Sequence, residues 1–502
     1  MFGKVLVANR GEIAIRVMRT LEELGIASVA VYSEPDRDAP HARRADEAFL
    51  LGPGPANESY LVVEKIIDVA QKSGAEAIHP GYGFLAENAD FAAAVEAAGL
   101  AFVGPSAEQI RTLGDKRAVR ALALEAGVPV VPGAEGGDPA ALARAAKRLG
   151  FPVMVKAALG GGGKGMSVVA GEPALGEAIE SAQRIALSAF GDPTVYLEQQ
   201  LERPRHVEVQ VLGDGRGGAI HLFERECSLQ RRHQKVIEES PAPSITDRRR
   251  EELAAAAVKL ARAARYRSAG TVEFLITPGG EFFFLEMNTR LQVEHPVTEL
   301  VTGLDLVRLQ LEIAATGELS LRQAEVARRG HAIEARIYAE DAARNFLPQA
   351  GEVARARWPR GPFVRVDAGV ESGDAVPVQY DPILAKLIAL GAERAAALHR
   401  LATALDDTLV HGVVTNLPFL RALARAPEVQ AARFDTEWIE REFLASFTAL
   451  ATAPAPELAL AAAALAESFG GASPARSSTG AAAFPRGSAF ESLGRWRHPG
   501  LE

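Results

Sequence analysis

The chain has 502 residues, of which 48 % are hydrophobic, and carries a formal net charge of −9 at pH 7. This length supports two to four domains with substantial cores, and the acidic balance excludes a general nucleic-acid-binding surface. The single cysteine, Cys227, excludes an internal disulfide and fits a reducing compartment. No signal peptide, transit peptide or membrane span is recognisable, so we expect a protein of the cytoplasm or, in a eukaryote, of the mitochondrial matrix, with no membrane or nucleic-acid partner.

Predicted strands and helices alternate through residues 1–113. The turn ANRGEIA after the first strand lacks the G-x-G-x-x-G pattern, so we predict no dinucleotide site there. Alternation of this kind is typical of a parallel, doubly wound sheet. The predicted strands are 4–8, 28–32, 77–79 and 100–103, and the first helix is 12–24.

Two further folded regions and a tail follow, which makes the overall class α/β and α+β. Residues 114–330 and 331–446 each mix strands and helices, whereas 447–502 are rich in Ala, Pro, Ser and Gly and predict a flexible linker with one short helix. The predicted strands are 151–157, 194–198, 206–212, 271–276, 331–338, 364–367 and 384–389, and the helices are 115–126, 249–265 and 392–406.

A run of glycines follows the predicted strand 151–157. In VMVKAALGGGGKGM, Lys156 precedes the glycines and Lys164 lies among them. Glycines allow backbone N–H groups to approach an anion, and lysine ammonium groups bind phosphate. The spacing excludes a P-loop, and a flexible surface hairpin explains the glycines equally well.

The most informative stretch is EFFFLEMNTRLQVEHP, residues 281–296. Polar residues occupy every second position, and residues two apart in an extended strand share one face. A buried ridge with two carboxylates, two amides and a guanidinium is costly unless it binds something, although a solvated edge strand remains the alternative. These five residues are Glu286, Asn288, Arg290, Gln292 and Glu294.

Pro278-Gly279-Gly280 predicts a tight turn before this stretch. With a loop of two or four residues centred on Gly279-Gly280, Glu273 lies directly opposite Glu286. Two carboxylates in that position repel each other and destabilise a sheet. A divalent cation such as Mg²⁺ or Mn²⁺ bound between them makes the interaction favourable. A loop of three residues would break this register.

The segment 224–239 groups Arg231, Arg232, His233 and Lys235 between acidic residues. A solvated charged face with weak salt bridges is the simplest explanation of such a run. His206 shares a strand face with Glu208, where a structural role is the more common one.

Together these motifs resemble the ATP-grasp fold and, more narrowly, the biotin carboxylase family. The resemblance covers about residues 1–446. It is carried by KVLVANRGEIAIR at the N-terminus, IHPGYGFLAEN at 78–88, GDK at 114–116, the glycine run, RRHQK at 231–235, EMNTRLQVEHPVTE at 286–299 and EARIYAED at 334–341. It implies a Rossmann-like domain at 1–113, an ATP-grasp domain at 114–330 with a mobile glycine-rich lid at about 131–203, and a mixed C-terminal domain at 331–446.

The resemblance also implies an activity, in which ATP and bicarbonate carboxylate biotin by way of carboxyphosphate. Glu294 would be the general base, Arg336 would lie beside the biotin ureido oxygen, and Glu273, Glu286 and Asn288 would hold Mg²⁺ or Mn²⁺, with two ions expected. Lys235, Arg290, Gln292 and Val293 would bind bicarbonate. The implied nucleotide contacts are Lys116, Lys156, Gly161, Gly162, Gly163, Gly165, Met166, Glu198, Leu201, His206, Gln230 and His233.

One residue departs from the family pattern, because Gln199 stands where many relatives carry a lysine. Two other functions stay open at this point. Another ATP-grasp ligase would transfer phosphate to an amine or carboxylate acceptor, and a scaffold subunit would bind nucleotide without catalysis.

Biotin itself is expected on a carrier, not on this chain. The last lysine is Lys386, and a carrier domain needs a lysine for attachment. LGRWRHPG near the C-terminus resembles the start of a docking domain, so we expect a truncated α subunit or else a separate carrier protein. A carboxyltransferase partner and a homodimer are implied by the family, and the final acyl-CoA substrate is not encoded here.

Overall fold

The computed structural model describes residues 1–136, 138–157, 167–191 and 193–451. The predicted phosphate-binding residues Gly161, Gly162, Gly163, Gly165 and Met166 lie outside these described residues, as does the predicted tail from residue 452 onwards. Within the described ranges, no helix combines the length and apolar character that crossing a membrane requires.

The N-terminal part forms a five-stranded parallel sheet, as predicted. Apolar residues of α1 (Gly11–Glu23) pack on one face, and those of α3 (Val63–Ser73) and α4 (Ala89–Ala97) pack on the other, so the sheet is doubly wound. The sequence analysis missed the edge strand β3. The strand order is β3 (Glu47–Gly52), β2 (Ala27–Ser33), β1 (Lys4–Val7), β4 (Ala77–His79) and β5 (Ala101–Phe102).

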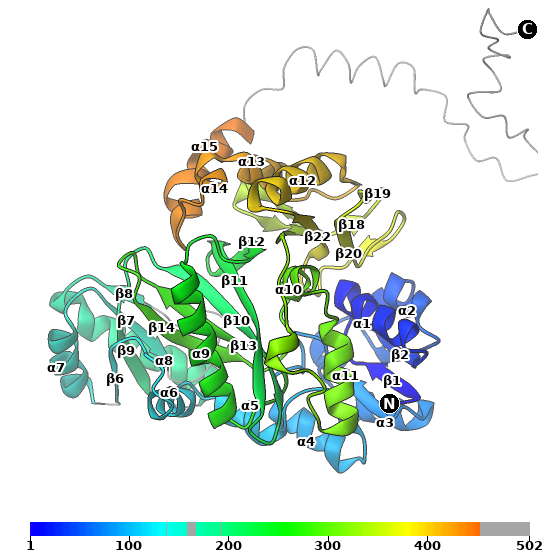
Figure 1. Ribbon diagram of the computed structural model, residues 1–502, viewed down its shortest axis with the longest axis horizontal. Helices are drawn as coiled ribbons and strands as arrows, with labels where there is room; N and C mark the ends of the chain where they lie inside the picture. Colours follow the sequence, from blue (N-terminus) through cyan, green and yellow to red (C-terminus); the bar gives the residue numbers. More distant parts are fainter. Residues whose placement is uncertain (137, 158–166, 192, 452–502) are drawn as a thin grey trace, which may run out of the picture. The chain divides into compact units, whose positions relative to one another are not determined.

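A large antiparallel sheet of eight strands spans the second and third predicted regions (Figure 1). Because β12 pairs with β15, the sheet continues across the predicted boundary at residue 330. Its strand order is β14 (Phe282–Asn288), β13 (Arg267–Ile276), β10 (Arg205–Asp214), β11 (Ala219–Arg231), β12 (Gln234–Ser240), β15 (His331–Tyr338), β22 (Ile383–Gly391) and β20 (Val364–Ala368).

Strand periodicity separates the two faces of this sheet. On β10, Val207, Val209 and Val211 join the core beneath α9 (Asp247–Ala263), together with Leu253 and Leu260 of that helix. The intervening residues His206, Glu208 and Gln210 are buried on the opposite face. A buried polar face of this kind is the natural place to look for a site.

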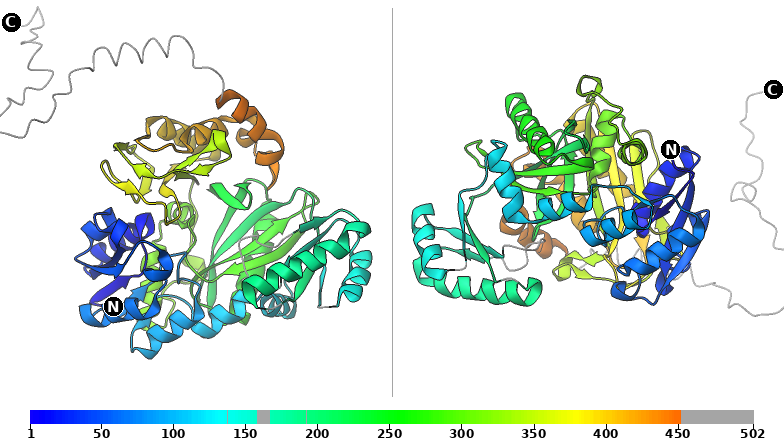
Figure 2. Two further views of the ribbon diagram at one scale, coloured as in Figure 1. Left: turned by 180° about the vertical axis from the view of Figure 1, so that it is seen from behind. Right: turned by 90° about the horizontal axis from the view of Figure 1, so that it is seen from below.

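A separate four-stranded sheet lies within the segment predicted as the lid. Its strands are β6 (Gly133–Gly136), β9 (Val195–Gln199), β7 (Val153–Ala157) and β8 (Ser167–Val169), in that spatial order. Helices α7 (Pro139–Leu149) and α8 (Leu175–Phe190) cover it through their own apolar cluster, which includes Leu142 and Ile179 (Figure 2). The unit therefore has a core distinct from that of the large sheet.

The C-terminal helices pack on β15 and β22 through a further apolar core. The other principal helices are α6 (Lys116–Glu125), α10 (His295–Thr302), α11 (Leu306–Thr316), α12 (Arg394–Asp407), α13 (Leu417–Arg425) and α15 (Leu444–Ala451). The shorter elements are α2 (Pro40–Arg44), α5 (Ala107–Gly114), α14 (Pro427–Gln430), β16 (Glu340–Asp341), β17 (Leu347–Pro348), β18 (Gly351–Glu352), β19 (Arg355–Arg357), β21 (Ala375–Val376), β23 (Leu409–His411), the 3-10 turns η1 (Glu34–Asp36), η2 (Ala56–Glu58), η3 (Glu172–Ala174), η4 (Gln323–Glu325) and η5 (Ala342–Arg344), and a π-helical turn, η6 (Ile439–Phe443).

Candidate active site

The β13–β14 hairpin places Glu273 directly opposite Glu286, as predicted. The predicted turn, however, was wrong. The N–H of Thr277 donates to the carbonyl of Glu281 at 2.9 Å, which leaves a loop of three residues, 278–280.

A β-bulge restores the register between the turn and the site. The bulge follows Phe284, and both Phe284 and Met287 are buried in the core beneath α9 although they are three residues apart. A regular strand cannot do this, because its side chains alternate with a period of two. The extra residue therefore compensates for the odd loop length, and the two carboxylates meet for a reason that the sequence analysis did not foresee.

The predicted polar ridge is only partly a strand, because β14 ends at Asn288. The side chains beyond it still converge. Arg290 donates to the side-chain oxygens of Asn288 at 3.2 Å and Gln292 at 3.0 Å, and Gln292 donates to Glu273 at 3.1 Å. Glu294 occupies the N-cap position of α10. The ridge thus turns into the start of a helix while keeping its side chains at one site.

At the centre of the site, the Lys235 ammonium bridges three carboxylates. Its Nζ lies 2.5 Å from Glu208, 3.0 Å from Glu273 and 2.6 Å from Glu294. An ammonium has three N–H groups, so all of its donors are used. The sequence analysis interpreted the segment around Lys235 as a solvated run of charges. Lys235 lies instead in the β11–β12 hairpin, which places its side chain in this cluster.

Glu294 is fully buried between two cations. Besides Lys235, the Arg336 guanidinium donates to its Oε2 at 2.9 Å. Burial alone would raise the pKa of Glu294, but Lys235, Arg336 and Arg225 outweigh burial and hold the pKa well below its usual range. Glu294 is therefore ionised at neutral pH.

The carboxylates around Lys235 differ in the direction in which the site shifts their pKa. Burial favours the neutral form of Glu273, but the charges of Lys235 and His206 reverse this effect and lower its pKa. Burial raises the pKa of Glu208, although the charge of Arg225 opposes it. His206 lies 2.8 Å from Glu273, and that carboxylate raises the histidine pKa against the effect of burial.

Glu286 differs from its cross-strand partner. Its carboxylate makes no hydrogen bond or ion pair with another residue of the described ranges. Burial and the neighbouring charge of Glu273 raise its pKa, with Lys116 acting in the opposite direction. A carboxylate held near a second carboxylate and left without a close partner is a suitable ligand for a divalent cation.

The predicted nucleotide contacts within the described ranges belong to several elements. Lys116, at the start of α6, is close enough to Lys156, Glu198 and Glu286 for their charges to act on it, and burial lowers its pKa. Lys156 on β7 is ion-paired with Glu198 on β9. Leu201 follows β9, Gln230 is buried on β11, and His233 lies in the exposed β11–β12 turn.

Several residues of this cluster escaped the sequence analysis. Glu208 accepts from Arg225, which also donates to Gln210 at 2.7 Å and Thr298 at 3.0 Å. Glu87, from the N-terminal part, accepts from Arg290 at 3.0 Å. The alternation of His206, Glu208 and Gln210 was a usable signal for the strand face, whereas Arg225 and Glu87 reach the site only through tertiary packing.

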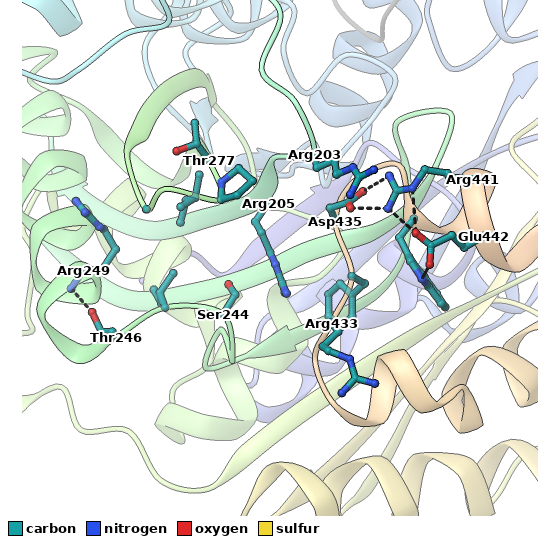
Figure 3. Close-up of a pocket in the computed structure, with 16 residues that line it drawn as sticks. Arg203, Arg205, Ser244, Thr246, Arg249, Thr277, Arg433, Asp435, Arg441 and Glu442 are labelled. Carbon is teal, nitrogen blue, oxygen red and sulfur yellow. Dashed lines mark hydrogen bonds and ion pairs between the residues drawn. The ribbon is translucent and has the colours of Figure 1, made fainter.

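A cavity of about 700 Å³ lies on the other face of the sheet (Figure 3). Arg205 and Ile276, which are cross-strand partners, line it together with Trp438. Since Arg205 precedes His206 on one strand, the two side chains point to opposite faces. Arg205 donates to the Ala432 carbonyl at 2.5 Å, and Arg441 pairs with Asp435 at 2.7 Å. This cavity is therefore separate from the Lys235 cluster.

Comparison with known proteins shows the family to which this chain belongs. The description "Biotin carboxylase, N-terminal domain" matches residues 1–110, "Carbamoyl-phosphate synthase L chain, ATP binding domain" matches 115–322, and "Biotin carboxylase C-terminal domain" matches 334–441. The biotin carboxylase of Pseudomonas aeruginosa is 52 % identical over 429 residues, which cover 85 % of this chain and 95 % of that protein. The chain belongs to the biotin carboxylase family.

Other relatives define the extent of the match. A pyruvate carboxylase subunit from Methanothermobacter thermautotrophicus is 50 % identical over 442 residues, covering 88 % of this chain and 90 % of that protein. The chain spans only 63 % of the mitochondrial methylcrotonoyl-CoA carboxylase α chain of Dictyostelium discoideum, with 48 % identity over 439 residues and coverage of 87 % of this chain.

Solved structures agree with the family assignment. A biotin carboxylase–β-γ-ATP complex from Campylobacter jejuni has a TM-score of 0.86 with 41 % identity and covers 88 % of this chain and 99 % of its own. The biotin carboxylase domain dimer of Hydrogenobacter thermophilus 2-oxoglutarate carboxylase, with MgADP, ADP and bicarbonate, has a TM-score of 0.84 with 43 % identity over 88 % of this chain and 97 % of its own. The predicted ATP-grasp fold and enzyme class are thereby confirmed.

Proposed function

We propose that this biotin carboxylase family member uses ATP and bicarbonate to carboxylate biotin presented by a carrier protein or domain. The observation that carries the proposal is the buried Glu294 carboxylate, held between Lys235 and Arg336 and next to the Glu273–Glu286 pair. A base, two cations and a pair of carboxylates at one place suit bicarbonate activation by phosphoryl transfer.

Bicarbonate would bind along the segment from Arg290 to Val293. Arg290 offers a fork of N–H donors, and Gln292 offers both an amide donor and an acceptor. Lys235 supplies the nearest ammonium. A carboxylate-like anion matches this donor set, which also agrees with the bicarbonate named for the Hydrogenobacter structure.

Glu294 would take the bicarbonate proton. Its two cations hold its pKa low, which makes it a weak base. An incoming anion competes for the Lys235 ammonium, and weaker pairing with Lys235 raises the basicity of Glu294. Glu294 would therefore become a stronger base only when bicarbonate, which carries the proton to be removed, is bound.

Glu273, Glu286 and Asn288 fit a Mg²⁺ or Mn²⁺ site, and the unpartnered Glu286 carboxylate is the observation that supports this fit. Such ions, two of which we expect, would offset the charge of the nucleotide phosphates. Asn288 now donates its amide N–H to Glu273 at 2.8 Å, so metal binding requires it to present its oxygen instead. Lys116, Lys156 and His206 would contact the phosphates.

The chemistry would proceed in three steps. A bicarbonate oxygen attacks the γ-phosphorus of ATP, ADP leaves, and carboxyphosphate forms; this intermediate then breaks down to CO₂ and phosphate. The phosphate accepts the proton from biotin N1′, Arg336 stabilises the resulting ureido oxyanion, and the nitrogen attacks CO₂. Enclosure of the site would protect the labile intermediate from water.

The partners follow from this reaction. Biotin would arrive on a carrier domain or protein, a carboxyltransferase would consume the carboxybiotin and select the final substrate, and the chain itself would form a homodimer. We assign it to the cytoplasm or the mitochondrial matrix.

The direct test measures ATP hydrolysis with purified protein and free biotin. We expect hydrolysis to depend on Mg²⁺ and bicarbonate, to rise with biotin, and to yield acid-labile carboxybiotin from labelled bicarbonate. Hydrolysis that does not depend on bicarbonate but requires an amine or carboxylate acceptor would support a different ATP-grasp ligase. Nucleotide binding without turnover would support a scaffold subunit.

A further inference from the structure

Behind Arg336 lies a second pair of acidic residues that the reaction described above does not use. Glu238 on β12 and Glu334 on β15 are direct cross-strand partners in the large sheet. Both side chains are fully buried. Cross-strand partners are roughly 5 Å apart at Cβ, where two negative charges repel each other strongly in a site without water.

The two carboxylates have unequal partners. The oxygens of both carboxylates lack a hydrogen-bond partner within the described part of the chain, but Glu238 forms an ion pair with the Arg336 guanidinium at 2.5 Å, whereas Glu334 forms none there. Lys386, the nearest ammonium on β22, is held by Glu12 at 3.2 Å and by the Val293 carbonyl at 2.8 Å. Glu334 is therefore buried without an ion pair of its own among the described residues, although the charge of Lys386 acts on it.

The single positive charge of Arg336 cannot neutralise all the carboxylates around it. It faces Glu294 at 2.9 Å and Glu238 at 2.5 Å and follows Glu334 by two residues on the same strand face. Three carboxylates beneath α10 thus act on one guanidinium, and only Glu294 among them is also paired with Lys235. An uncompensated buried carboxylate costs several kcal/mol, and the usual remedy is a proton.

We propose that Glu238 and Glu334 hold one proton between them, carried by Glu334, and that the charge left on Glu238 positions the Arg336 guanidinium against Glu294. The assignment rests on the proposed function, in which Arg336 faces the biotin. Glu238 is then a positioning residue, and Glu334 is the neutral partner that allows Glu238 to stay ionised.

The electrostatics agree with this division of roles. Burial raises the pKa of Glu334 well above its usual range, and this effect, with that of Glu238 and Glu294, outweighs the opposing charges of Lys386 and Arg336. Burial also raises the pKa of Glu238 to about 7, although Arg336 opposes the shift. The charged and titratable groups that face the pair are Arg336, Glu294, Lys235 and Lys386, with the Cys227 thiol nearby.

This arrangement predicts a pH dependence with a definite sign. As pH falls through about 7, Glu238 takes up a proton and its attraction for Arg336 weakens. The value of kcat/KM for biotin should therefore decrease on the acid side of neutrality. ATP hydrolysis that depends on bicarbonate alone should be less affected, because Lys235 and Arg225 still act on Glu294 when Arg336 is displaced.

Two substitutions distinguish the role of Glu238 from that of Glu334. Glu238→Gln removes the positioning charge, so we expect KM for free biotin to rise about tenfold while biotin-independent ATP hydrolysis changes less than about twofold. The acid-side decrease in kcat/KM should also disappear. Glu334→Gln mimics a protonated acid and should keep KM for biotin within about twofold of the parent value.

The control lies next along the strand. Glu239 is equally buried but points to the other face, where it binds His331 at 2.6 Å and Arg394 at 2.8 Å. Glu239→Gln should lower the melting temperature without changing KM for biotin. A general structural effect of losing a buried carboxylate would instead raise KM in both Glu238→Gln and Glu239→Gln.

Infrared spectroscopy tests the proton without relying on activity. The parent protein at pH 8 should show the C=O stretching band of a protonated carboxyl group, which Glu334→Gln removes and Glu238→Gln retains. A difference spectrum without this band would overturn the proton assignment even in a protein with no biotin carboxylase activity. Equal loss of biotin affinity in Glu334→Gln and Glu238→Gln would overturn the division of roles.

Discussion

The distribution of charge around Lys235 governs the chemistry at the residue scale. One ammonium faces three carboxylates, and each has a different set of further partners. Glu294 gains Arg336, Glu273 gains His206, and Glu208 gains Arg225. Removing one carboxylate from this set changes the pKa of the others, so substitutions here act as a group and not independently.

Glu294→Gln tests the base. The amide keeps the shape of the carboxylate but cannot accept the bicarbonate proton, so we expect carboxylation to fall at least about 100-fold. ATP affinity, measured by equilibrium binding, should remain nearly unchanged because Glu294 does not face the nucleotide in the proposed arrangement. Retention of full activity in this variant would show that another group removes the proton.

Glu286→Gln tests the proposed metal site. The substitution removes one charged ligand, so we expect the Mg²⁺ concentration for half-maximal activity to rise about tenfold or more, measured by titration at saturating ATP. Glu281→Gln is the matched control, because Glu281 is an exposed residue on the same hairpin. A normal Mg²⁺ titration in Glu286→Gln would argue against the carboxylate pair as the metal ligands.

At the scale of single elements, the β13–β14 hairpin shows how local geometry sets a site. Its three-residue loop shifts the register by one, and the bulge after Phe284 shifts it back. Without the bulge, the residues beyond Phe284 would exchange faces, and Leu285 would replace Glu286 opposite Glu273. The loop and the bulge are therefore coupled features of one strand pair.

Gly280→Ala tests the turn. Gly280 has φ = +84°, a conformation that alanine adopts with strain, and the nearest atom to an added Cβ is 3.8 Å away. We expect a loss of about 1 kcal/mol in stability, measured by thermal unfolding, with kcat retained because the bulge lies nearer the site. Gly279→Ala is the control, since its φ is not positive and the nearest atom is 3.7 Å away. An equal loss in both variants would show that strain at Gly280 is not the cause.

At the scale of the whole molecule, ion pairs join the N-terminal part to the large sheet. Arg19 of α1 donates to Asp367 of β20 at 2.9 Å, and Asp367 also accepts from Arg365 at 2.7 Å. Arg16 of α1 pairs with Glu299 of α10 at 2.7 Å. Glu87 of the N-terminal part reaches Arg290 in the site. The position of the site residues thus depends on contacts between segments far apart in sequence.

Asp367→Asn tests this connection and its pH dependence. Burial favours the neutral acid, but Arg365 and Lys386 outweigh it and lower the Asp367 pKa, so its stabilising effect is present above the unfolded pKa of about 4 and is lost as pH falls below it. We expect the variant to lose about 3 kcal/mol at pH 7 and to approach the parent protein in melting temperature at lower pH. A difference that is the same at pH 7 and at pH 3 would contradict the assignment.

The sequence by itself determined the fold class and the family, because strand periodicity and long ordered motifs are local properties of the chain. It predicted the Glu273–Glu286 pairing only through a turn of the wrong length. It could not reveal that β12 pairs with β15, that a bulge corrects an odd turn, or that Lys235 is buried among three carboxylates. Those features depend on which distant segments meet and on how much water their contact excludes. Burial and cross-strand neighbours decide whether a charged residue is solvated or part of a site, and only the tertiary structure supplies both.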